Sequence, residues 1–157
     1  MAMSLDTDVD VLRRIPFFDG FSDEHLKLIA FSAESRSLPE KLLLYDEGQL
    51  LHSAYVIVSG SLHGERQVAG GDKTLSRTIG PGAILGHRAL ILDTRASESV
   101  RVESRARVLQ IRKAMFRRLL QEYPEIAVTL RARIARDLIE VSAELSDVAR
   151  RLASLPG

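Results

Sequence analysis

Residues 79–100 of this chain read IGPGAILGHRALILDTRASESV, and this stretch decides how the rest of the sequence is interpreted. Its glycines at 80, 82 and 86 predict a tightly bent approach, because glycine adopts backbone conformations that other residues avoid. A short apolar turn at 89–92 follows, and then a new strand-like run begins. Unpaired N–H groups at a helix start attract anions. The stretch therefore predicts an anion-holding hook set between strands.

Short runs rich in Val, Ile, Leu and Tyr recur on both sides of the hook, between Ser37 and Arg112. Turn residues separate these runs, and the clearest hairpin tip is the AGGDK segment at 69–73. Several short strands at this spacing predict an antiparallel barrel or sandwich of the jelly-roll type. The expected strands cover 42–45, 54–58, 61–68, 73–79, 99–102 and 108–111.

Helical patterns flank the strands. A short helix is expected from Val9 to Ile15, and Ser22 is expected to cap a second one. After Lys113 the pattern is helical again, with a short helix before Pro124 and a long one after it. Apolar residues of the long helix alternate three and four positions apart, as in a heptad seam: Leu138, Val141, Leu145, Val148, Leu152 and Leu155. We expect this seam to form a homodimer, the alternative being a helix that packs back on the barrel.

The composition excludes several classes of protein. The 157 residues contain no cysteine, which rules out disulfides, thiolate metal sites and cysteine nucleophiles, and the net charge is +1. No apolar run approaches the roughly 20 residues that span a bilayer, so we expect a cytoplasmic protein without membrane contact. The histidines lack metal-ligand spacing and the serines lack a nucleophile elbow. We therefore expect neither a metal site nor an enzyme.

Four motifs occur in an informative order: LRRIPFF at 12–18, FSDE at 21–24, AYVIVSGSL at 54–62 and IGPGAILG at 79–86. Together they resemble the cyclic nucleotide-binding domain of Crp/Fnr-type regulators, over roughly residues 11–140. The last motif resembles the approach to the phosphate-binding cassette of that family.

The resemblance implies a mainly β fold with flanking helices: a double-stranded β-helix (jelly roll) with N-terminal helices and a long C-terminal dimerisation helix. The corresponding organisation is a polar tail at 1–10, a cyclic nucleotide-binding-like jelly-roll domain at 11–123 and a C-terminal helix at 124–157. Crp/Fnr regulators read DNA through a helix-turn-helix that follows the long helix. Because the sequence ends at Gly157, we expect no direct DNA binding.

The resemblance also implies a set of ligand-binding residues: Leu85, Gly86, His87, Arg88, Ala89, Leu90, Arg95, Ser97 and Ser99. His87 stands where the family usually has a glutamate that accepts a hydrogen bond from the ribose 2′-hydroxyl. The family's phosphate-pairing arginine has two candidate positions. Aligned without a gap, Ala96 takes its place and Glu98 replaces a family alanine. Aligned with a one-residue deletion, Arg95 takes the arginine role, and both registers stay open.

Two hypotheses of function follow from these residues. In the first, the chain is a small-molecule-sensing regulatory domain that binds a cyclic nucleotide (cAMP or cGMP) or another small anion. Ligand occupancy would then reach the C-terminal helix and a dimer or protein-partner surface. In the second, the chain is a degenerate, non-binding member that acts as a dimerisation or interaction module. That hypothesis expects Glu98 to be paired internally with Arg88 or Arg95.

Overall fold

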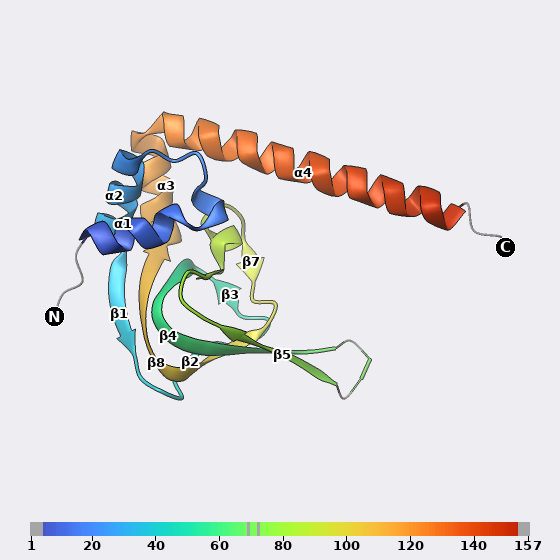
Figure 1. The fold of residues 1–157 in the computed structure, drawn as a ribbon, viewed down its shortest axis with the longest axis horizontal. Coiled ribbons are helices and arrows are strands. Elements are labelled where there is room, and N and C mark those ends of the chain that lie inside the picture. The colour runs from blue at the N-terminus through green and yellow to red at the C-terminus, as the bar shows by residue number, and fades with distance from the viewer. Residues whose placement is uncertain (1–4, 69, 72, 154–157) are drawn as a thin grey trace. The chain divides into compact units, whose positions relative to one another are not determined.

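The computed structural model describes residues 5–68, 70, 71 and 73–153, without the side chains of residues 137–145 and 148. The chain divides into two compact units, Met1–Leu119 and Leu120–Gly157. The first unit contains all the strands of the described residues, and the second contains the helix α4 (Pro124–Ala153), which Figure 1 draws in orange to red. The division falls inside helix α3 (Lys113–Glu122).

The first unit is a roll of strands with short helices before and within it. Its strands are β1 (Glu34–Leu38), β2 (Leu43–Tyr45), β3 (Leu50–Leu51), β4 (Ser53–Gln67), β5 (Thr74–Ile79), β6 (Ile84–Leu85), β7 (Thr94–Arg95) and β8 (Ser99–Arg112). Its helices before α3 are α1 (Leu5–Arg13), η1 (Pro16–Phe18), α2 (Asp23–Ser32) and η2 (His87–Leu90). The predicted fold class, a mainly β jelly roll with flanking helices, is confirmed.

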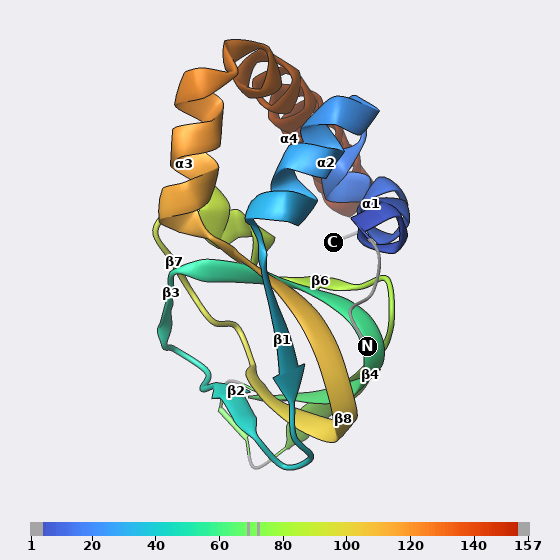
Figure 2. The same cartoon turned by 90° about the vertical axis from the view of Figure 1, so that its left-hand side faces the viewer.

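Strand β8 organises the roll, because it pairs antiparallel with β1, β2 and β4. The main sheet runs β1-β8-β4-β5, with β6 also paired to β4, and β3 pairs with β7 in a second small sheet. Figure 2 shows β1, β8 and β4 side by side. Strands β4 and β5 form the hairpin that the sequence predicts, and Val68 N–H donates to the carbonyl of Lys73 at 3.0 Å. Ala69 and Asp72 of the predicted tip lie outside the described residues.

The two longest strands, β4 and β8, each cover two segments that the sequence predicts as separate strands. Residues 54–58 and 61–67 belong to the one strand β4, which ends one residue before the predicted Val68, and residues 99–102 and 108–111 belong to β8. The pairing register between these strands shifts around Gly60, where φ is 85°. A Cβ at Gly60 would overlap the backbone carbonyl of Arg105. Gly60 therefore marks a bulge that bends a continuous strand.

The core of the roll is formed by side chains from its strands, from η2 and from the segment between β7 and β8. Its buried members are Leu38, Tyr45, Leu51, Ile57, Leu62, Ile79, Leu85, Ala89, Ala96, Val100, Val102, Ala106 and Val108. Burial of apolar surface is the dominant favourable contribution to folding. The core includes residues from both ends of the stretch at 79–100, so this stretch packs inside the roll.

The N-terminal helices are tied to the strands by polar contacts as well as by burial. Ser22 caps α2 as predicted, since its hydroxyl accepts a hydrogen bond from the backbone of His25 at 3.1 Å. Helix α1 begins at Leu5, earlier than the predicted Val9. Its Asp8 carboxylate accepts a hydrogen bond from the Arg107 guanidinium of β8 at 2.7 Å, and both side chains are largely buried.

Helix α4 is one continuous helix of 30 residues, as the sequence predicts. Its described side chains include two exposed apolar ones, Val128 (63% exposed) and Leu152 (64% exposed). The other predicted heptad positions lie outside the described side chains: Leu138, Val141, Leu145, Val148 and Leu155. Within the described part of the chain, no helix combines the length and the apolar character that crossing a membrane requires.

Candidate functional site

The bent turn predicted within 79–100 forms at the junction between β6 and η2, and its anion-holding role stays a prediction. Gly86 joins the two elements with a φ of 71°, a left-handed conformation that favours glycine. A Cβ at this position would lie 2.9 Å from the backbone carbonyl oxygen of Ser53 on β4. The η2 turn that follows buries Ala89 and Leu90. Both the conformation and the close approach of β4 therefore require glycine at position 86.

The two polar residues of η2 lie in different surroundings. His87 is half-buried, and its ring lies against Phe17 of η1 with the ring centroids 5.2 Å apart. Arg88 is exposed. His87 therefore contacts the N-terminal helical segment, a contact that the sequence analysis does not anticipate. The ligand roles expected of both residues stay predictions.

The structure places Arg95 and Ala96 on opposite sides of the chain. Arg95 is exposed on β7 and donates a hydrogen bond to the backbone carbonyl of Gly48 at 3.0 Å. Ala96 is 6% exposed, and its backbone is hydrogen-bonded to Gly48 and Gln49, both at 2.8 Å. The side chain that enters the roll here is thus a methyl group, as in the alignment without a gap.

The residues that follow Ala96 become progressively more buried, from exposed Ser97 to buried Val100. Ser97 is exposed, whereas the Glu98 side chain is 14% exposed. Ser99 opens β8, and its hydroxyl accepts a hydrogen bond from the backbone N–H of Glu47 at 2.8 Å. The two serines predicted as ligand contacts are therefore separated by an inward-pointing carboxylate.

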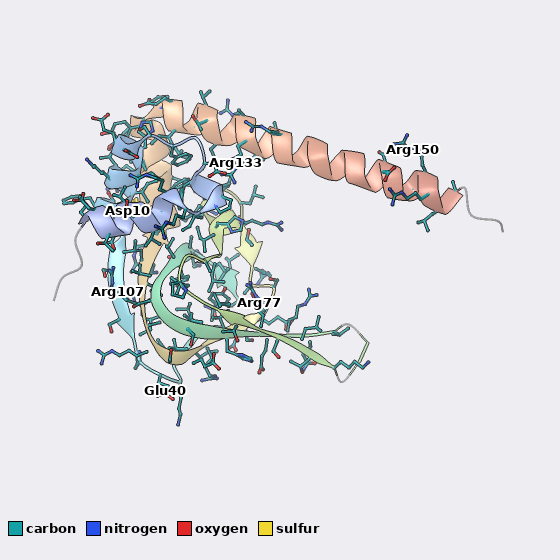
Figure 3. All side chains as sticks on the ribbon, viewed as in Figure 1. Asp10, Glu40, Arg77, Arg107, Arg133 and Arg150 are labelled. Atoms are coloured by element: carbon teal, nitrogen blue, oxygen red, sulfur yellow. The ribbon has the colours of Figure 1, made fainter. Side chains whose placement is uncertain are left out.

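Glu98 is paired with Arg77 of β5. The Arg77 Nε donates to both carboxylate oxygens, at 3.0 and 3.2 Å, and its Nη2 donates to Oε2. Figure 3 labels Arg77, on the β5 side of the roll, and Arg107, on the side toward β1. The prediction that Glu98 pairs with Arg88 or Arg95 is wrong. The loop after η2 places Glu98 against the β4–β5 hairpin instead, where it pairs with Arg77.

Gly64 makes room for this ion pair. It lies opposite Arg77 in the β4–β5 register, and a Cβ at position 64 would overlap the Glu98 carboxylate. Sequence reasoning missed both Gly64 and Arg77. The signal was present, because a hairpin with its tip at 69–73 places residue 64 opposite residue 77. A glycine facing a long charged residue in that hairpin indicates space for a third group.

The ion pair affects the ionisation of nearby groups. The hydrogen bond to Glu98 raises the pKa of Arg77, so this guanidinium stays charged. Tyr45 is 5% exposed in the adjoining core, and burial raises the pKa of its hydroxyl, with a further contribution from the negative charge of Glu98. The Glu98 carboxylate therefore influences two groups, the exposed guanidinium of Arg77 and the buried, protonated phenol of Tyr45.

An open hollow of about 490 Å³ lies beside the ion pair. It is lined by Arg66, Leu75, Ser76, Arg77, Ser97 and Glu98. Another hollow, of about 560 Å³, has Ser99, His63 and Arg101 among its walls, so Ser97 and Ser99 line different hollows. Among the described residues, no three His, Asp or Glu side chains gather closely enough to hold a metal ion. The hollow at Arg77 offers arginines and serine hydroxyls, the donors that suit an anion.

Comparison with known proteins identifies this arrangement. Residues 35–123 match the model of the cyclic nucleotide-binding domain. The cyclic AMP receptor protein of Thermus thermophilus is 26% identical over 130 residues, which are 83% of this chain and 60% of that protein. The chain therefore spans about three fifths of the length of this curated relative.

Solved structures agree with the family match. A cyclic nucleotide-binding-like protein from Brucella abortus is 36% identical, with a TM-score of 0.65 over 73% of this chain and 97% of its own. The N-terminal domain of a Streptomyces coelicolor transcriptional regulator has the same fold, with a TM-score of 0.79 at 23% identity over 87% of this chain and 95% of that chain. The glycine-opened turn, the roll around it and these similarities lead to one conclusion: the chain belongs to the cyclic nucleotide-binding domain family.

Proposed function

We propose that this chain is a cytoplasmic, non-catalytic sensing domain for a cyclic nucleotide or a related small anion. The observation that carries the proposal is the hollow at Arg77, where Arg66, Arg77 and Ser97 converge from β4, β5 and the segment after β7. Charge-assisted hydrogen bonds from arginine suit a phosphate group. The family to which the chain belongs supports a regulatory role.

We further propose that occupancy of the hollow is relayed along β8 to the C-terminal helix. Glu98 directly precedes β8, and β8 continues without a break into α3 at Lys113. A ligand that moves the start of β8 would therefore act on a strand that pairs with β1, β2 and β4. The chain then passes from α3 into α4, where exposed Val128 and Leu152 suit a homodimer or a protein partner.

Isothermal titration calorimetry with cAMP and with cGMP tests the sensing role. We expect saturable heat, and we expect Arg66→Met to weaken binding about tenfold, the effect of losing one charge-assisted contact. Arg105→Met is the matched control, since Arg105 is exposed on β8 and donates to Ser37, away from the hollow. No heat and no thermal shift at millimolar nucleotide would reject the proposal for these ligands.

A second function, a ligand-independent dimerisation or interaction module, is favoured by the Arg77–Glu98 ion pair. That pair already neutralises the largely buried Glu98 carboxylate with a group from the chain itself. This function predicts the same dimer with and without nucleotide, measured by sedimentation velocity. A nucleotide-dependent change in the sedimentation coefficient would instead support sensing with relay to the C-terminal helix.

A further inference from the structure

We propose that Glu98 is a built-in competitor for Arg77, so that the phosphate of a ligand binds Arg77 only when the Glu98 carboxylate has left it. This inference rests on the proposed function, since it concerns the same hollow. It assigns Arg77 as the cation that receives the ligand's phosphate group. It also assigns Glu98 as the group that sets how tightly the ligand binds.

The geometry of the ion pair supports competition. Glu98 accepts hydrogen bonds from Nε and Nη2 of Arg77, and this is one of the edges through which a guanidinium binds a phosphate in a bidentate contact. The Glu98 side chain is 14% exposed, whereas Arg77 is 56% exposed and lines the hollow. A ligand in the hollow can therefore reach the Arg77 guanidinium, but the Glu98 carboxylate already occupies its Nε and Nη2 donors.

Charge leads to the same conclusion. With Glu98 ionised, the pair carries no net charge, and the carboxylate repels an incoming phosphate. With Glu98 neutral, a positive charge remains beside two serines, Ser76 and Ser97, that line the same hollow. The space over Gly64 accommodates the Glu98 side chain closely, and an amide of the same shape fits it equally well. Glu98→Gln therefore removes the charge while keeping the packing.

Isothermal titration calorimetry with cAMP and with inorganic phosphate tests the inference on four proteins: the unaltered chain, Glu98→Gln, Glu98→Gln with Arg77→Met, and Glu103→Gln. We expect Glu98→Gln to bind at least about tenfold more tightly than the unaltered chain, equivalent to about 1.4 kcal/mol. The double variant should lose this gain. Glu103→Gln, an exposed carboxylate of β8, should bind like the unaltered chain. Circular dichroism confirms that each variant is folded.

The outcomes separate this inference from the proposed function. Binding by Glu98→Gln alone supports competition and rejects sensing of these ligands by the unaltered chain. Equal binding by the unaltered chain and Glu98→Gln supports sensing and overturns competition. A gain that survives Arg77→Met also overturns it, because Arg77 would then not be the receiving cation. If none of the folded variants binds, both proposals are rejected for these ligands.

Discussion

Gly64→Ala is the sharpest test of the site, because a single methyl group there meets the Glu98 carboxylate. A Cβ at position 64 would overlap that carboxylate, and its next neighbour, Cδ1 of Ile79, lies at an ordinary 3.4 Å. Gly64 does not have a positive φ, so alanine can adopt its backbone conformation. We therefore expect the methyl group to displace Glu98 and to break its ion pair with Arg77, with little other effect.

The expected magnitude is the difference between two effects. Replacing a strand glycine with alanine stabilises the native state by about 0.5–1 kcal/mol. The unfolded alanine chain has less conformational entropy, so less entropy is lost on folding. The Arg77–Glu98 pair lies between the surface and buried classes of ion pair, so its loss costs about 1–2 kcal/mol. Gly64→Ala should therefore lower the free energy of unfolding by up to about 1.5 kcal/mol. With Glu98→Ala already present, the same change should raise it by about 0.5–1 kcal/mol.

Urea denaturation of the unaltered chain, both single variants and the double variant completes a double-mutant cycle. The cycle should give a coupling energy of about 1–2 kcal/mol between positions 64 and 98. Gly80→Ala is the control, since a Cβ at Gly80 meets nothing within 4 Å. An equal effect of Gly64→Ala in both backgrounds would refute the reasoning, because the glycine would then not be making room for Glu98.

Three other perturbations have defined outcomes. Asp8→Ala leaves the largely buried Arg107 without its carboxylate and should lower the free energy of unfolding by about 3 kcal/mol in urea denaturation. Glu34→Ala, at an exposed ion pair, should lower it by less than about 1 kcal/mol. Equal losses of stability would contradict this prediction. Gly86→Ala should cost at least about 1 kcal/mol in thermal denaturation, because alanine is strained at a φ of 71° and approaches the β4 backbone. Burial raises the pKa of Tyr45 in the folded protein. Above pH about 10 Tyr45 therefore ionises in the unfolded chain while it stays protonated in the folded one, and the free energy of unfolding falls as pH rises. Tyr45→Phe should reduce this alkaline loss, by about 1.4 kcal/mol per pH unit at most, and an unchanged loss would disprove the assignment.

Much of the fold follows from local signals in the sequence. The Ser22 cap, the β4–β5 hairpin and the glycine-opened turn at Gly86 each depend on the chemistry of a few adjacent residues, and each forms where it is predicted. Strand lengths are less local. The sequence around Gly60 resembles a turn, yet pairing with β8 carries β4 through that point as a bulge. Long-range pairing overrides local propensity there.

The backbone of the candidate site was predictable, and its polar contacts were not. The motif around Gly86 predicts the cassette turn, because the conformation and the packing both demand glycine. The partner of Glu98 depends on which strand the loop after η2 faces, and this is a tertiary property. Arg88 and Arg95 are closer in sequence, but Arg77 of the neighbouring hairpin is the residue that pairs with Glu98. The hairpin register places Gly64 opposite Arg77, and this pairing is the sequence signal that points to Arg77 as the partner of Glu98.

The central place of β8 has a consequence for how the protein is made. Its partners β1, β2 and β4 are all synthesised earlier, and Arg36 and Gln110, hydrogen-bonded across β1 and β8, are 74 positions apart. Contacts this distant in sequence slow folding, because the loop must close before any pairing is gained. A nascent chain that has not yet reached Arg112 thus carries strand edges that await a partner. Nascent chains halted before and after this point should differ sharply in their resistance to protease.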